Sequence, residues 1–167
     1  MVEYHDHEWG REIRDERGLF ERMCLESFQS GLSWLIILRK RERFREVFDG
    51  FDPAAVAAFG PDDVDRLLGD AGIVRNRRKI EAAIVNASVV LDLDGGFGTL
   101  LWSFAPAPGP APATMADVPA STEQSVAMAR ELKRQGFCFF GPTTAYALMQ
   151  ATGMVNDHLA ACVAREP

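Results

Sequence analysis

Apolar residues recur along this chain at the spacing of α-helices, in segments that end at glycine. The first clear segment places Leu19, Phe20 and Met23 on one face and stops at Gly31. Proline and N-cap residues begin the later segments, and glycine ends most of them. The predicted helices cover approximately residues 19–30, 33–50, 53–60, 62–69, 77–93, 123–135 and 142–153. Strand signals are nearly absent, so the pattern predicts an all-α fold.

One segment interrupts the helical pattern. Four prolines fall within the seven positions 106–112, so residues 105–112 are predicted to form an exposed, extended loop. No repeat and no linker composition divides the chain. With 167 residues, 47% of them hydrophobic, the chain can bury a full core, and we expect a single monomeric domain over residues 1–167.

Composition excludes several classes of protein. No apolar run reaches 18 residues, and the first eight residues are rich in acids and histidine where a leader would be basic and then apolar. We therefore expect no membrane span, no signal peptide and a cytoplasmic location. The three cysteines, Cys24, Cys138 and Cys162, lack CxxC spacing, which favours reduced thiols over disulfides.

Charge is unevenly distributed along the chain. The net charge of −6 is a poor match to a nucleic-acid-binding protein, but nine of the eighteen basic residues lie in two short windows, 39–45 and 75–79. For window 39–45, which contains Glu42, a solvated helix face is an alternative to a nucleic-acid surface. Window 75–79 follows a glycine turn, which favours a role in binding.

Aromatic and acidic residues gather in segments 4–10 and 25–34. They supply four aromatic rings and one carboxylate, from Tyr4, Trp9, Phe28, Trp34 and Glu26. Such a set suits a flat, electron-poor heterocycle such as a purine, because rings stack on its faces and the carboxylate binds its positive edge. Taken alone, each aromatic is more often a core residue, and Glu26 fits the surface equally well.

Segments 4–10 and 25–34, together with Asp70–Arg75 and Met154–His158, resemble the 3-methyladenine DNA glycosylase I family of bacterial base-excision repair enzymes. The resemblance runs in order from Tyr4 to about Cys162. It implies a helix-hairpin-helix DNA glycosylase fold with a second small helical lobe that joins the N- and C-terminal segments. It also implies monofunctional hydrolysis of the N-glycosidic bond of 3-methyladenine in alkylated double-stranded DNA, after the base is flipped into a pocket.

The resemblance places Glu26 in that pocket as the catalytic residue, with Tyr4, Trp9, Phe28 and Trp34 around the base. Alkylation at ring nitrogen 3 makes adenine cationic, so a carboxylate that accepts a hydrogen bond favours it over neutral adenine. The cationic base is already an activated leaving group. Firm binding and a positioned water then suffice for excision, and catalysis needs no cofactor.

A glycine turn within residues 62–93 is the second implied site. Gly72 permits the tight turn, and the backbone amides there, with Arg75, Arg77 and Lys79 around them, would hold a DNA phosphate. Helix–glycine–helix turns are common, so the spacing alone is a weak signal. The resemblance is what makes this signal specific.

The resemblance also places Gly31 and Leu32 at the DNA surface, where Leu32 would fill the gap left by the flipped base; a core position for Leu32 is the alternative. Other helix-hairpin-helix glycosylases carry a catalytic aspartate about one helix beyond the hairpin, and Asp92 and Asp94 fall near that distance. Acids at a helix end before two glycines are usually solvated, so neither aspartate is favoured as a catalytic residue. No motif supplies a lysine nucleophile, which favours a hydrolase over a lyase.

His158 and Cys162 stand four residues apart in a predicted helix, so both can reach one metal ion. The resembled family joins its termini with a structural zinc ion, bound by these two residues, a histidine that matches His5, and a cysteine upstream. Only four residues precede His5 in this sequence, so we expect a zinc site that lacks its fourth ligand. His7 is a poor substitute because it lies on a different face from His5.

Two other functions remain open. A non-enzymatic helix-hairpin-helix protein that binds DNA or a nucleobase would show salt-sensitive DNA binding without base release. A metal-dependent hydrolase using His5, His158 and Cys162 would need a general base nearby, and the neighbouring acids have no distinctive spacing.

Overall fold

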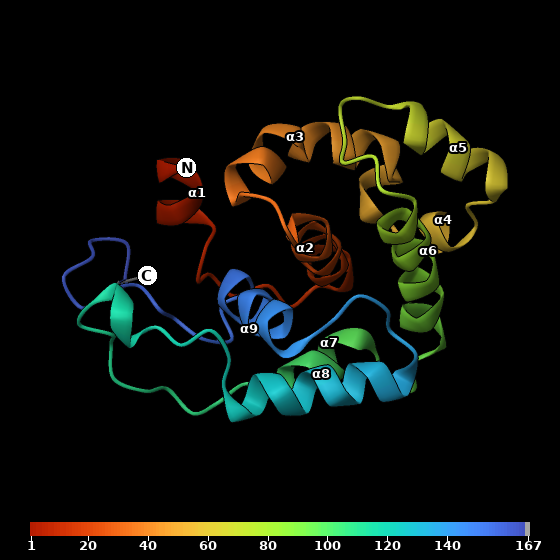
Figure 1. Ribbon diagram of the computed structural model, residues 1–167. Helices are drawn as coiled ribbons and strands as arrows, with labels where there is room; N and C mark the ends of the chain where they lie inside the picture. The colour runs from red at the N-terminus through yellow and green to blue at the C-terminus, as the bar shows by residue number, and fades with distance from the viewer. Residues whose placement is uncertain (166–167) are drawn as a thin grey trace.

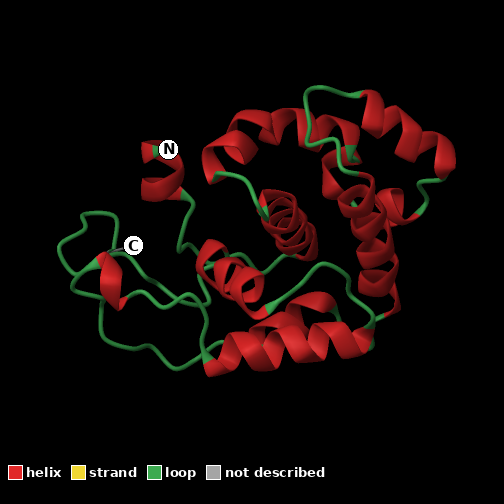
Figure 2. Cartoon of the chain, viewed as in Figure 1, coloured by secondary structure: helices red, strands yellow, loops and turns green. Residues whose placement is uncertain are grey.

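The computed structural model describes residues 1–165. Over these residues helices are the only regular secondary structure, which confirms the all-α prediction (Figure 2). The elements in chain order are α1 (Val2–His7), α2 (Glu16–Gln29), α3 (Trp34–Val47), the 3-10 turn η1 (Asp49–Phe51), α4 (Pro53–Ala57), α5 (Pro61–Gly69), α6 (Arg77–Asp92), α7 (Phe97–Trp102), the 3-10 turn η2 (Met115–Asp117), α8 (Glu123–Gln135) and α9 (Pro142–Ala151).

Helix α2 lies at the centre of the fold. In Figure 1 it is seen nearly end-on, and it packs against α3, α6, α7 and α9. Its side chains at Leu19, Phe20, Met23 and Leu25 are fully buried. Because α2 is covered on most sides, even its charged residues Arg22 and Glu26 are buried. Burial of a charged group without a partner is costly unless the group faces a site that binds a ligand.

Sequence signals explain most of the helix boundaries. Asn76 caps α6 by accepting a hydrogen bond from the Lys79 amide at 3.3 Å. Asp52 accepts one from the Ala54 amide at 2.9 Å, just where Pro53 begins α4. Asp52 and Asn76 directly precede the helix starts that the sequence predicts at residues 53 and 77. Helices α1 and α7 were not predicted, because six residues carry too little periodic pattern.

The C-terminal segment corrects one prediction. Helix α9 ends at Ala151, and the stretch from His158 to Cys162 is not helical, so the helix expected there is wrong. The chain turns at Gly153, where φ is 74° and an added Cβ would lie 2.5 Å from the carbonyl carbon of Arg11. Only glycine permits this close approach, which turns the C-terminal segment back along the N-terminal one.

Three distant segments of the chain meet beside the two termini (Figure 1). The amide of Gly10 donates to the carbonyl of Gln150 at 3.0 Å. Residues 105–112 lack regular secondary structure, as predicted, and the carbonyl of Pro112 accepts a hydrogen bond from the amide of Ala160 at 2.9 Å. The N-terminal segment, the proline-rich loop and the C-terminal segment therefore form one end of the molecule.

Two predictions from composition agree with the structure. Within residues 1–165, no helix combines the length and the apolar character needed to span a membrane. Cys24, Cys138 and Cys162 are free thiols, and Cys24 is buried in the core.

Candidate active site

A cavity of about 440 Å³ opens between α1, the C-terminal half of α2, α9 and the C-terminal segment. A volume of this size is usual for a small-molecule site. Its walls include most of the residues singled out from the sequence, namely Tyr4, His5, Trp9, Glu26, Trp34, His158 and Cys162. Other lining residues were not predicted, among them Met115, Ala147, Gln150 and Leu159. No sequence signal marks these four, since only the fold brings their elements together.

Two aromatic side chains present unused hydrogen-bond donors near this cavity. The rings of Tyr4 and Trp34 lie 5.3 Å apart between centroids, tilted by 50°. The Tyr4 hydroxyl and the Trp34 indole Nε1 are buried, and neither has a hydrogen-bond partner among the described residues. Burial raises the pKa of Tyr4 well above its ordinary value, so this hydroxyl stays protonated. Buried polar groups are almost always paired, so two unpaired donors point to a bound molecule.

Glu26 is the carboxylate of the cavity. It lies in the last turn of α2, is only 5% exposed, and accepts no hydrogen bond from the described residues. The alternative of a surface glutamate is therefore wrong. Burial raises its pKa to about 7, with the positive charge of Arg22 acting in the opposite direction. A cationic ligand would relieve this burial penalty, because it favours the ionised carboxylate.

Trp9 lines the cavity together with His5 and His158. Its ring stacks on His5 at 6.0 Å and meets His158 edge-on at 4.7 Å, both measured between ring centroids. Helix α1 is only six residues long and cannot hold Trp9 by itself. The indole orientation therefore depends on the two histidine rings.

The prediction that Phe28 lines the pocket is wrong. Phe28 is fully buried, and its ring packs on Phe44 at 4.6 Å and on Phe48 at 5.7 Å between centroids. Phe28 and Glu26 are two residues apart on α2, which separates them by about 200° around the helix axis. When Glu26 faces the cavity, Phe28 must face the opposite side, which is the core.

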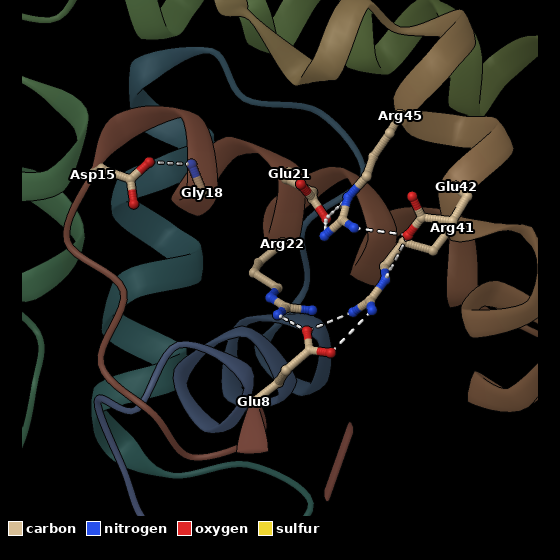
Figure 3. A network of polar contacts seen from close by, with 8 residues as sticks. All are labelled: Glu8, Asp15, Gly18, Glu21, Arg22, Arg41, Glu42 and Arg45. Atoms are coloured by element: carbon tan, nitrogen blue, oxygen red, sulfur yellow. Dashed lines mark hydrogen bonds and ion pairs between the residues drawn. The ribbon is translucent and has the colours of Figure 1, made fainter. Parts of the chain in front are cut away.

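Glu8 anchors the N-terminal segment to the helices, a role that no sequence motif indicates. Its carboxylate accepts hydrogen bonds from Arg22 of α2 at 2.6 Å and from Arg41 of α3 at 2.5 and 2.9 Å (Figure 3). The two guanidinium groups hold the pKa of Glu8 down at about 2, against the opposing effect of burial. This bridge fixes the residue that precedes Trp9, so it supports one wall of the cavity.

Replacing Glu8 with glutamine is expected to destabilise the protein by about 2 kcal/mol at pH 7, because Arg22 would remain buried with its charge poorly compensated. The depressed pKa means that this contribution is present above pH 4.5 and is lost as the pH falls toward 2. Thermal unfolding should show the midpoint of E8Q about 4–8 °C below wild type at pH 7, with the gap closing near pH 2. Glu42→Gln is the control, because Glu42 is exposed and its pair with Arg45 contributes little. Equal midpoints for E8Q and E42Q would contradict this role.

The turn between α5 and α6 packs on α3. The amide of Gly72 donates to the Asp70 carboxylate at 2.7 Å, and the Lys40 ammonium donates to the carbonyl of Ala71 at 2.6 Å. An added Cβ at Gly72 would lie 2.5 Å from Cγ of Arg43. The close approach of Arg43, and not a left-handed backbone, is therefore what requires glycine in this turn.

The cations expected around this turn have three different environments. Arg75 is exposed and forms no ion pair among the described residues. Arg77 is exposed but pairs with Asp65 at 2.7 Å. Lys79 is only 7% exposed, and its ammonium donates to backbone carbonyls of the α2 end, so the expectation that it lies on the surface beside Arg75 is wrong. Lys79 follows the cap Asn76 on the inner face of α6, a position that the charge pattern could not reveal.

The basic window 39–45 is occupied largely by internal ion pairs. Arg41 binds Glu8, and Arg45 binds Glu21 (Figure 3). Arg43 binds Asp70. These pairs tie α3 to its neighbours, so the window contributes less free positive charge than its composition suggested.

Residues 30–33 form an exposed connection between α2 and α3. Gly31 has a φ of 82° with open space around it, and Leu32 is 37% exposed. The alternative that Leu32 is a core residue is therefore wrong. Asp92 and Asp94 are exposed at the C-terminal end of α6, and neither lines the cavity.

Three side chains beside the cavity come together as a possible metal site. His5, His158 and Cys162 each offer a ligand atom within 4.8 Å of the others, and His5 Nε2 lies 3.9 Å from Cys162 Sγ. Ligands of tetrahedral zinc lie roughly 3.3–3.8 Å apart, given metal–ligand bonds of about 2.0–2.3 Å. Nδ1 of His5 contacts Asp6 at 2.7 Å and Nδ1 of His158 contacts Asn156 at 2.8 Å, the outer bonds typical of metal-binding histidines. The donor types suit zinc, and Nε2 of His158, which lies 3.1 Å from the carbonyl oxygen of His5, would leave that contact to bind the ion.

His7 does not belong to this cluster. It is exposed on α1, and among the described residues only His5, His158 and Cys162 are close enough together to share an ion. His5 lies on α1, whereas His158 and Cys162 lie on a segment without regular secondary structure.

Known proteins resemble this chain over nearly its whole length. It is 46% identical to DNA-3-methyladenine glycosylase 1 of Escherichia coli K12, over 96% of this chain and 89% of that protein. It is 42% identical to DNA-3-methyladenine glycosylase of Haemophilus influenzae Rd, over 96% of this chain and 90% of that protein. A crystal structure of 3-methyladenine DNA glycosylase I superimposes with a TM-score of 0.93 at 44% identity, covering 97% of this chain and 92% of that one.

A further solved structure, of 3-methyladenine DNA glycosylase I from Staphylococcus aureus, concerns how that enzyme recognises 3-methyladenine. It superimposes with a TM-score of 0.94 at 34% identity, covering 99% of this chain and 91% of that one. The model of the methyladenine glycosylase family matches residues 1–166. The chain belongs to the methyladenine glycosylase family.

Proposed function

We propose that this protein excises 3-methyladenine from alkylated double-stranded DNA by hydrolysis of the N-glycosidic bond. The observation that carries this proposal is Glu26, a buried carboxylate in a cavity flanked by two donors, from Tyr4 and Trp34. Among residues 1–165, none of these three groups has a hydrogen-bond partner. Acceptor and donors together match the polar edge of a purine, and the aromatic rings match its faces. Family membership supports the same activity.

The chemistry follows from the charge of the substrate. When the bond between the base and the sugar carbon breaks, its electron pair moves to the cationic base, which leaves neutral. Water adds its oxygen to the sugar carbon and releases a proton. Glu26 holds the flipped cation by charge and hydrogen bonding, so the base stays out of the stack while water attacks. No lysine lines the cavity among the described residues, which supports hydrolysis over a lyase reaction.

We propose that DNA is held by the turn at Gly72 with Arg75 and Arg77, and by the exposed loop at Gly31 and Leu32. Arg75 is exposed and forms no ion pair within the part of the chain that the structure describes, which suits it to bind phosphate. The exposed apolar side chain of Leu32 suits the space that a flipped nucleotide leaves. The protein would act as a monomer in the cytoplasm.

We also propose a structural zinc ion bound by His5, His158 and Cys162. When bound, the ion joins the N- and C-terminal segments and supplies no chemistry to the excision. The residues bound to it fix Trp9, which contacts both histidine rings. The cavity wall thereby gains order that α1 alone cannot provide.

Incubation with double-stranded DNA that has been methylated with dimethyl sulfate tests the activity. Mass spectrometry of the released bases should show 3-methyladenine above the spontaneous background, in proportion to the enzyme added. Circular dichroism of the same preparation shows whether the protein is folded. Folded protein that binds the DNA but releases no base would instead establish the non-enzymatic alternative.

A further inference from the structure

The ammonium group of Lys79 lies in the interior, between α6, which follows the turn at Gly72, and the C-terminal end of α2. It donates hydrogen bonds to the carbonyl of Phe28 at 3.0 Å and to the carbonyl of Ser30 at 2.5 Å. The side chain is 7% exposed. Two of the three N–H donors of this ammonium are used inside the protein, and its burial leaves little of the side chain open to a DNA phosphate.

The two carbonyls lie where α2 needs donors. The last four carbonyls of an α-helix have no partner inside the helix, and the last turn of α2 carries no basic residue of its own. A cation at this end also interacts favourably with the helix dipole. Lys79 of α6 therefore supplies from another helix what the sequence of α2 lacks.

Gln29 also holds the loop of residues 30–32, to which Ser30 belongs. The amide of Leu32 donates to the carbonyl of Gln29 at 2.7 Å, and the side-chain amide of Gln29 donates to the carbonyl of Leu32 at 2.9 Å. Gly31 between them meets no other atom within 4 Å of an added Cβ. The loop 30–32 is thus exposed at its tip and held only at its two ends.

We propose that Lys79 is a positioning residue that holds loop 30–32 and Glu26 in a fixed relation to the hairpin; this inference rests on the proposed function. Glu26 precedes the bonded carbonyl of Phe28 by two residues, and Leu32 follows that of Ser30 by two. Lys79 lies three residues after Asn76, the N-cap of α6, which follows the turn at Gly72. Phosphate binding at the hairpin therefore sets where Leu32 enters the duplex and where Glu26 meets the flipped base.

The test compares Lys79→Met with Arg75→Ala in DNA binding and in single-turnover excision of 3-methyladenine. For Lys79→Met we expect the single-turnover rate at saturating DNA to fall by at least about tenfold, since small displacements of reacting groups cost this much or more. Its slope of log Kd against log salt should equal that of wild type. For Arg75→Ala we expect a slope smaller by about one, because this change removes one contact to phosphate.

A Lys79→Met protein with the reduced salt slope of Arg75→Ala and a normal saturated rate would overturn the proposal, because that result describes a phosphate ligand. If Lys79→Met does not fold, Lys79→Arg decides. A positioning role predicts a lowered saturated rate for this variant, because the planar guanidinium does not fit the two carbonyls as the ammonium does. A role as a phosphate ligand predicts the saturated rate of wild type. Failure of the proposed function itself would appear separately, as a wild-type protein that releases no base.

Discussion

Replacing Glu26 with glutamine is expected to lower single-turnover excision of 3-methyladenine by about 10- to 100-fold, since a hydrogen bond to a charged group contributes about 1.5–3 kcal/mol. The amide keeps the size of the side chain but removes the charge that favours the cationic base. Excision from methylated DNA and calorimetric titration with free 3-methyladenine both measure the loss. Glu123→Gln is the control, because Glu123 is exposed on α8 and does not line the cavity.

The same variant should be more stable than wild type at alkaline pH. Burial raises the pKa of Glu26 to about 7, so the folded protein binds its proton more tightly than the unfolded chain. Between about pH 4.5 and 7 the stability of wild type therefore falls as the pH rises. Glu26→Gln is free of this penalty, which amounts to up to about 3 kcal/mol at pH 8 and vanishes below pH 4.5.

Thermal unfolding at pH 4.5 and pH 8 measures this difference. The midpoint of Glu26→Gln should exceed that of wild type by several degrees at pH 8 and match it at pH 4.5. The excision rate of wild type should also fall as the pH drops below 7, because the carboxylate becomes neutral. Unchanged excision in Glu26→Gln, with unchanged stability at pH 8, would show that Glu26 does not face the base.

Removing the proposed zinc ion is expected to lower the unfolding midpoint by about 10 °C, because an ion present at about a thousand times its Kd stabilises the fold by roughly 4 kcal/mol. Cys162→Ser should have the same effect and should lower the metal content measured by elemental analysis. Affinity for free 3-methyladenine should fall in parallel, since Trp9 is held by the ring of His158.

Cys138→Ser is the matched control for this experiment. Cys138 is a partly exposed free thiol that does not belong to the cluster of His5, His158 and Cys162. Chelation should leave Cys162→Ser unaffected while it destabilises wild type and Cys138→Ser equally. If wild type contains no metal and Cys162→Ser unfolds like wild type, packing alone holds Trp9.

The sequence by itself determined most of the helical segments and several of the residues that line the cavity. Helical periodicity needs only local spacing, and caps such as Asp52 and Asn76 act on neighbouring amides, so both can be read along the chain. The grouping of Tyr4, Trp9, Glu26 and Trp34 was also predicted, because aromatic rings beside an isolated acid form an uncommon composition. All four line the cavity.

The tertiary structure decided which side of each helix is covered. Phe28 and Glu26 both lie near the end of α2, yet the ring packs in the core and the carboxylate faces the cavity. Lys79 looked like its neighbour Arg75, but the fold places the end of α2 against it and buries it. Local sequence cannot distinguish these cases, because burial depends on which distant segment packs there.

Contacts between segments far apart in the sequence also decided the conformation of the two ends of the chain. The sequence predicted a helix through His158 and Cys162, but the backbone of Arg11 lies against Gly153 and the C-terminal segment turns into a loop. The cluster with His5 forms nonetheless, because the loop returns along the N-terminal segment. Residue types fixed which ligands were available, and the packing of segments about 150 residues apart fixed their geometry.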